Sequence, residues 1–212
     1  MRNNWTVDSS KILTETEIVE VLADLKRRAR RSANSRMNLI IFRLATCCGL
    51  RVSEMINLRL SDMRLGVKRP HIKIRAAIAK CHRARRVPLW WDQGTLDDLV
   101  SWRDERIKQG AAVGDPFLCS MARSSFGRPI DRQNARKRYI VSCRVLGPER
   151  TADLTIHDGR HSFVSHALKH RTLAEVRDAA GHANIATTSI YAHIATDEDG
   201  EIGDLFAFGK AV

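Results

Sequence analysis

Two histidines, an arginine and a tyrosine stand in the C-terminal third of the chain at spacings that could form a reactive site. His157 and Arg160 would lie one turn apart on a helix and share a face, and Tyr191 follows His182 by nine residues. Histidines transfer protons near neutral pH, a guanidinium binds phosphate through parallel hydrogen bonds, and an activated tyrosine can attack phosphorus. Each feature alone is more typical of a solvated helix face or a half-buried packing tyrosine. Their joint order favours a site.

Short helices are expected to position these side chains. Thr172 followed by Glu175 is a capping box that begins one helix, and Gly181 is suited to end it. Asn184 can cap the next helix, which would carry Tyr191. This arrangement predicts that the two histidines, the arginine and the phenol converge.

Taken together, the motifs HDGRH and GHANIATTSIYAHI resemble the signature of the tyrosine recombinases, the phage integrase family. Upstream, CGLRVSE resembles that family's T-G-L-R-x-S-E box and adds Arg51 and Glu54 to the set. The resemblance extends from about Leu13 to His193. It implies a mostly α fold with a small antiparallel β-sheet (α+β), like the catalytic domain of that family.

The resemblance also implies phosphodiester cleavage by six side chains, without metal, ATP or other cofactor. The tyrosine would form a 3′-phosphotyrosyl link, while two arginines and a histidine would bind the non-bridging oxygens. That histidine is His182, whereas His157 would help remove the tyrosine proton and return it at religation, and Lys80 would protonate the departing 5′ oxygen. In chain order these are Arg51, Lys80, His157, Arg160, His182 and Tyr191, with Glu54 supporting Arg51 and His161 as a structural neighbour.

The lysine is placed by two expected strands. Residues 71–75 and 85–89 alternate in polarity and predict a hairpin, with Lys80 in its connection. The family usually flanks this lysine with glycines, whereas alanine and cysteine stand here. Lys73 is a weaker candidate, because its place in the alternation predicts a strand surface.

Further helices are expected after the capping box at Thr14, in the apolar stretch 37–48, over the amphipathic stretch 95–108, and over the basic stretch 131–145. Residues 116–118 resemble a short buried strand of the family. A further position departs from the family pattern. Gly159 stands where leucine is usual, and a glycine inside a helix costs up to about 1 kcal/mol, which would loosen the helix that bears the second arginine.

Basic residues exceed acidic ones by 36 to 24, so the 212-residue chain carries a net charge of +12. Such an excess, clustered in the sequence, favours a polyanionic partner, and we expect double-stranded DNA. The arginines expected to face DNA are Arg30, Arg31, Arg36, Arg83, Arg85, Arg132 and Arg136.

Composition argues against several other classes of protein. The five cysteines are an odd number without C-x-x-C spacing, which favours free thiols over a disulfide framework or a zinc site. We find no apolar run long enough to span a membrane and no secretory signal at the N-terminus. The expectation is a cytoplasmic, nucleoid-associated protein.

The domain organisation follows from these features. Residues 1–10 are expected to be flexible, 11–194 to form the catalytic domain, and 195–212 to form an acidic and then apolar tail. The resemblance implies that this tail docks on a neighbouring protomer in a homo-oligomer, a tetramer on DNA; an intramolecular clasp is the alternative. The family's N-terminal core-binding domain is expected to be absent.

The sequence thus favours a site-specific DNA recombinase of the integrase or invertase type. Two alternatives are a type IB topoisomerase, which uses similar chemistry to relax supercoils, and a DNA-binding relic without catalysis. A helix-turn-helix regulator is least favoured, because it needs neither the tyrosine nor the hairpin lysine.

Overall fold

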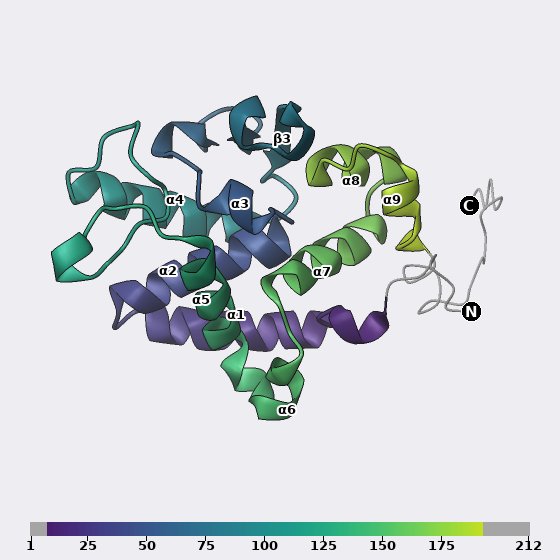
Figure 1. The fold of residues 1–212 in the computed structure, drawn as a ribbon, viewed down its shortest axis with the longest axis horizontal. Helices are drawn as coiled ribbons and strands as arrows, with labels where there is room; N and C mark the ends of the chain where they lie inside the picture. Colours follow the sequence, from purple (N-terminus) through teal and green to yellow (C-terminus); the bar gives the residue numbers. More distant parts are fainter. Residues whose placement is uncertain (1–7, 193–212) are drawn as a thin grey trace, which may run out of the picture.

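The fold consists of helices packed around one buried helix, with a small sheet at one side (Figure 1). The structure is a computed structural model and describes residues 8–192. The helices are α1 (Glu15–Ala29), α2 (Ala33–Phe42), α3 (Val52–Met55), α4 (Gln93–Lys108), α5 (Arg132–Cys143), α6 (Gly147–Ala152), α7 (Ile156–Leu168), α8 (Leu173–Ala180) and α9 (Ala186–Ser189). The strands are β1 (Met63–Arg64), β2 (His71–Ile74) and β3 (Arg85–Pro88). The predicted fold class is confirmed.

The buried helix is α2, which continues as a π-helical turn, η2 (Arg43–Cys47). Its apolar residues are buried on every side because α1, α4 and α5 pack around α2, and α7 packs on η2. Arg43 is also buried there, and its charge is compensated by ion pairs with Asp98 at 2.8 Å and Asp92 at 3.1 Å. The chain leaves η2 through Cys48, Gly49 and Leu50 and reaches Arg51 at the start of α3, so the buried helix determines where this arginine lies.

The sheet is antiparallel with the order β1-β2-β3, which confirms the predicted hairpin. Lys73 lies on the exposed side of β2, as its alternation predicts. The strand expected at 116–118 is wrong: Pro116 and Cys119 make only isolated bridges, each to a different partner. The Phe117 carbonyl instead accepts a hydrogen bond from the indole of Trp102, so this segment is buried without extending the sheet.

Capping side chains set the starts of the helices near the expected site. The boxes at Thr14 and Thr172 are present as predicted, and Gly181 ends α8 in the left-handed conformation with φ +69°. The side chain of Asn184 accepts from the amide of Ala186 at the start of α9, but α9 ends at Ser189. The prediction that Tyr191 lies on this helix is therefore wrong. Its amide donates to the Thr188 carbonyl in a tighter turn.

Four cysteines are free thiols in the described part of the chain: Cys48, Cys119 and Cys143 are buried, and Cys47 is half-buried. None of the described helices is both long and apolar enough to cross a membrane. The predictions for residues 1–7 and for the tail at 195–212 lie outside the described residues. Residues 8–10 belong to the start of a 3-10 turn over Ser9–Lys11 that Asp8 caps.

Gly159 lies where α7 crosses η2 most closely. A Cβ atom at this position would lie 2.8 Å from the hydroxyl oxygens of Thr46 and of Tyr139, and both of these side chains are buried. The glycine that lowers the helix propensity of α7 therefore permits the close contact between α7 and the core helix. The cost in helix propensity is offset by packing that a leucine could not make.

We predict that Gly159→Ala lowers the free energy of unfolding by about 1–2 kcal/mol, because overpacking outweighs the gain in helix propensity. Urea unfolding measures this change, and Gly114→Ala is the control, since a Cβ there meets nothing within 4 Å. Unchanged or increased stability of Gly159→Ala would contradict the packing argument. Adding Tyr139→Phe should restore part of the loss, because it removes one of the two colliding oxygens.

Candidate active site

Three consecutive carbonyl groups at the C-terminal end of α8 each accept a hydrogen bond from a different arginine. The last carbonyls of a helix have no partner inside it and carry the negative end of the helix dipole, so cations bind there favourably. The three arginines come from segments far apart in the sequence. The pairs are Ala179 with Arg85 Nε at 3.0 Å, Ala180 with Arg160 Nη2 at 2.7 Å, and Gly181 with Arg51 Nη2 at 3.2 Å.

Gly181 makes this convergence possible in two ways. Its positive φ ends α8 and turns the chain toward His182, a conformation that glycine adopts without strain. A Cβ atom at Gly181 would also lie 2.7 Å from Cδ of Arg85. A side chain at this position would therefore displace the arginine that lies against the helix end.

Glu54 is the carboxylate that pairs with two of these arginines, and it is fully buried. Its oxygens accept from Arg85 Nη1 at 2.6 Å and Nη2 at 2.8 Å, and from Arg51 Nη1 at 3.3 Å. Burial opposes ionisation of this carboxyl, but hydrogen bonds from Arg85 and the positive charges hold its pKa below the ordinary value of 4.5. The expected Arg51–Glu54 pair is confirmed.

Arg160 joins the two halves of the site. It is 3% exposed, and its Nη1 donates to the Gly49 carbonyl at 2.6 Å while its Nη2 bonds the end of α8. Burial, together with the positive charges of Arg51 and Arg85, lowers the pKa of Arg160 to about 9. Three guanidinium groups around one carboxylate leave the site with excess positive charge, so an anion bound here would be stabilised.

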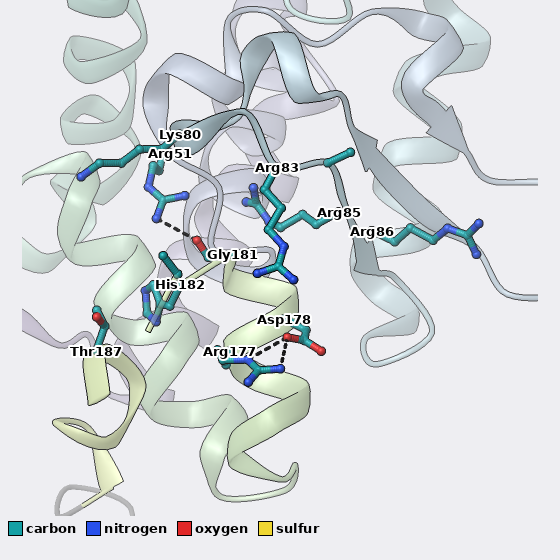
Figure 2. Close-up of a pocket in the computed structure, with 12 residues that line it drawn as sticks. Arg51, Lys80, Arg83, Arg85, Arg86, Arg177, Asp178, Gly181, His182 and Thr187 are labelled. Atoms are coloured by element: carbon teal, nitrogen blue, oxygen red, sulfur yellow. Dashed lines mark hydrogen bonds and ion pairs between the residues drawn. The ribbon is translucent and has the colours of Figure 1, made fainter. Parts of the chain in front are cut away.

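A cavity of about 640 Å³ opens beside this cluster (Figure 2). Arg51, Lys80 and His182 line it, so three of the six predicted catalytic side chains share one space. Lys80 lies on a 3-10 turn (Lys80–His82) in the connection between β2 and β3, and it is exposed. Arg83 and Arg86 also line the cavity, and their exposed side chains add to its basic character.

His182 is held in a fixed orientation at the edge of the cavity. Its Nδ1 lies 2.8 Å from the hydroxyl of Thr188, a buried residue of α9. Burial and the nearby charge of Arg160 lower the pKa of His182 to about 3. The imidazole is therefore neutral at physiological pH and can offer a single N–H to an anion.

Tyr191 lies against α7, outside the set of residues that line the cavity. The side chain is 4% exposed, and its hydroxyl is 2.5 Å from Nδ1 of His161. Burial raises the pKa of Tyr191, and the positive charge of Arg160 opposes this shift. The ring of His161 also contacts that of His157 edge-on, with centroids 4.7 Å apart. The phenol and the first two histidines of the helix thus form one group.

His157 itself is exposed at the start of α7, and it lines a different cavity, with Leu50 and Val52. Burial of part of the ring and the charge of Arg160 lower the pKa of His157. The charges of Arg51 and Lys80 act in the same direction.

Two of the arginines that we expect to face DNA have protein partners, and five are exposed. Arg36 forms an ion pair with Glu105 at 3.0 Å. Arg85 is committed to the buried network described above. The exposed members are Arg30, Arg31, Arg83, Arg132 and Arg136.

Two residues have contacts that sequence reasoning missed. The sequence predicts Arg85 on a DNA-facing surface, but it bridges Glu54 and the end of α8, and its partners lie 31 and 94 residues away. The sequence predicts a structural role for His161, which contacts the hydroxyl of Tyr191, 30 residues away. A signal for His161 was available, because it stands one helical turn after His157 and hence on the same face.

No group of three or more side chains suited to hold a metal ion occurs between residues 8 and 192. The expected metal-free route stays a prediction.

Comparisons with known proteins agree on one family. The model of the phage integrase family matches residues 11–198. The chain is 32% identical over 151 residues to tyrosine recombinase XerC of Herpetosiphon aurantiacus, covering 70% of this chain and 45% of that protein. It is 28% identical over 214 residues to tyrosine recombinase XerD of Staphylococcus saprophyticus, covering 93% and 68%. This chain spans about half the length of most of the curated relatives that it matches.

Among solved structures, the chain resembles the XerH site-specific recombinase bound to a palindromic difH substrate in a post-cleavage complex. The TM-score is 0.69 at 22% identity, and the match covers 90% of this chain and 51% of that one. A likeness at this identity supports the fold.

We predict that Arg85→Lys lowers the free energy of unfolding by about 2 kcal/mol, because lysine cannot make the paired bonds to buried Glu54. Arg86→Lys is the matched control: the neighbouring side chain is exposed, and its replacement should change stability by less than about 0.5 kcal/mol. Urea unfolding of both variants is the measurement. Equal losses in the two variants would show that Arg85 is an ordinary surface cation.

We predict that Glu54→Gln costs about 3 kcal/mol of stability at neutral pH, because it leaves two guanidinium groups without their carboxylate. The folded-state pKa of Glu54 is below 4.5, so the contribution of its charge is present above that pH and is lost as pH falls through the lowered value. The difference in the free energy of unfolding between the wild type and the variant should therefore become smaller below pH 4.5. Urea unfolding from pH 7 to pH 3 tests this, and a gap that stays constant would contradict it.

Proposed function

The chain belongs to the phage integrase family, and from this premise we propose that it is the catalytic domain of a tyrosine-type, site-specific DNA recombinase. The observation that carries the proposal is the set of three arginines on successive carbonyls of α8, beside a cavity that also contains Lys80 and His182. A phosphodiester would supply a negative charge to a cluster in which three guanidinium groups meet a single carboxylate.

The arginines are suited to stabilise the transition state of phosphoryl transfer. Arg51 and Arg160 would bind the non-bridging oxygens, where negative charge accumulates, and neutral His182 would donate a further hydrogen bond. Because their positions are fixed by backbone carbonyls and by Thr188, little reorganisation is needed when the charge develops. Such fixed donors typically contribute several kcal/mol to catalysis.

Tyr191 would be the nucleophile, forming a 3′-phosphotyrosyl link that keeps the bond energy for religation. Lys80, exposed and on the cavity wall, would protonate the 5′ oxygen as it leaves. His157 belongs to the proton-transferring part of the site, since its ring contacts that of His161. No step in this scheme uses ATP or a metal ion.

Cleavage by this route requires the site to open. Arg160 and Tyr191 are both buried, and neither lines the cavity beside Arg51. The phosphate can reach them only if the segment from His182 to Ile190, which packs on α7 and α8, changes position. We propose that DNA binding drives this change, because the phosphate offsets the repulsion among the arginines.

The partner is double-stranded DNA, bound across the basic side chains around the cavity and the exposed arginines of α5. The similar XerH structure holds its difH substrate. We propose a homo-oligomer, a tetramer on DNA with exchange of the tail at 195–212, as the assembly that recombines two duplexes. Location at the nucleoid stays a prediction.

Recombination is preferred to supercoil relaxation or to a catalytically inactive relic. The short spacing from His182 to Tyr191 and the names of the curated relatives support recombination. The presence of all six catalytic residue types supports an active enzyme.

We predict that the protein forms a denaturation-resistant adduct with nicked suicide duplexes, tested first with a pool of randomised core sequence. Tyr191→Phe should abolish the adduct, whereas Tyr139→Phe, which changes the other tyrosine of the chain, should retain it. Arg51→Ala should slow cleavage at least about 100-fold while weakening duplex binding only modestly. Tight binding without any adduct would favour the relic, and relaxation without strand exchange would favour a topoisomerase.

A further inference from the structure

We propose that His161, and not His157, takes the proton from Tyr191 when the phenol attacks phosphorus. The inference rests on the proposed function and adds a catalytic residue to it. It starts from the contact between the Tyr191 hydroxyl and Nδ1 of His161, at 2.5 Å. A nucleophile that is hydrogen-bonded to a base is the arrangement that activation of a hydroxyl requires.

The direction of this hydrogen bond follows from the surroundings of the phenol. The side chain of Tyr191 is 4% exposed and its hydrogen bond to His161 is part-buried, so the phenol proton favours an acceptor inside the protein. We assign this role to His161 Nδ1, with the imidazole neutral and its own proton on Nε2. In this tautomer the tyrosine proton points at the nitrogen that would receive it.

His161 is available as a base at physiological pH. Its burial and the adjacent imidazole of His157 lower the pKa of His161 to about 4, so the ring is unprotonated before DNA binds. The charged or titratable groups that act on it are His157, Asp158 and Arg160 of α7, together with Tyr191. Asp158, which is buried, favours the imidazolium, and a phosphodiester bound at Arg160 would favour it further.

His157 is less well placed for this proton transfer. It is exposed, and among the described residues its ring contact is to the edge of His161 rather than to the phenol. His161 in contrast stacks on the Tyr191 ring, with centroids 5.7 Å apart at 30°. Both histidines lie on the same face of α7, so the one that is a turn deeper reaches the nucleophile.

During cleavage the O–H bond of Tyr191 breaks, the proton moves to Nδ1 of His161, and an oxygen lone pair forms the bond to phosphorus. The bond from phosphorus to the 5′ oxygen breaks, and that oxygen takes a proton from Lys80. In religation the 5′ hydroxyl gives this proton back to the neutral Lys80 as it attacks phosphorus. The bond from phosphorus to the tyrosine oxygen breaks, and the imidazolium of His161 returns its proton to that oxygen.

The experiment compares His161→Asn with the wild type on a nicked suicide duplex recovered from the randomised pool. The asparagine carbonyl replaces Nδ1 as a hydrogen-bond acceptor but cannot take a proton, so it separates holding the phenol from deprotonating it. We expect the rate of adduct formation to fall about 100-fold or more. His170→Asn, which changes an exposed histidine after α7, is the control and should react at the wild-type rate.

A second measurement varies the acidity of the nucleophile. Fluorinated tyrosines incorporated at position 191 release their proton more easily, so they should partly rescue His161→Asn and leave the fold of the protein unchanged. A deficit that shrinks as the phenol becomes more acidic supports proton transfer. A deficit that is the same for every phenol shows that His161 only positions the ring, and it overturns the inference.

Cleavage by His161→Asn at the wild-type rate overturns the inference but leaves the proposed function intact. The same conclusion follows if acidic phenols rescue His157→Asn and do not rescue His161→Asn. Absence of an adduct in the wild type overturns both. Independently of activity, nitrogen NMR of labelled histidine should show His161 Nδ1 unprotonated at neutral pH and shifted in Tyr191→Phe; a protonated Nδ1 would refute the proposed direction of the bond.

Discussion

The end of helix α8 is the constraint on which the site depends. Arg51, Arg85 and Arg160 approach from α3, β3 and α7, and each bonds a carbonyl of the last turn or of the glycine that ends the helix. A carbonyl at the end of a helix orients a guanidinium but leaves its positive charge uncompensated. A carboxylate would orient the guanidinium and also neutralise its charge. Backbone acceptors therefore keep the arginines in place and available to a phosphate.

Glu54 supplies one negative charge where three positive ones meet, and this imbalance opposes folding while it favours binding. It is visible in the lowered pKa of Arg160, which reflects burial and repulsion by its neighbours. A phosphodiester would relieve that repulsion, so part of the binding energy comes from a site that is strained when empty. We propose that this binding energy also drives the movement of the segment before Tyr191. Binding of the phosphate would in this way be coupled to exposure of the tyrosine.

Local signals in the sequence predict the helices well, because capping boxes, apolar runs and Gly181 act over a few residues. The hairpin with Lys80 is equally local. What the sequence could not predict are contacts between distant segments, such as Arg85 with Ala179 or Tyr191 with His161. A basic residue next to others in a basic run looks exposed, and only the packing of β3 on α8 makes Arg85 a buried link. The two-residue strand β1 has no periodicity to detect.

The sequence of α7 places candidate site residues on one side of the helix and also allows its backbone to pack closely on η2. His157, Arg160 and His161 fall on one side at helical spacing, so a single helix fixes the guanidinium proposed to bind the anion relative to the imidazoles proposed to transfer the proton. The helix can serve as that element only if it is held firmly. Gly159 lets its backbone approach η2, where Thr46 and Tyr139 meet it, and Thr155 with Asp158 caps its start. The residue that departs from the family pattern thereby contributes to the precision of the site.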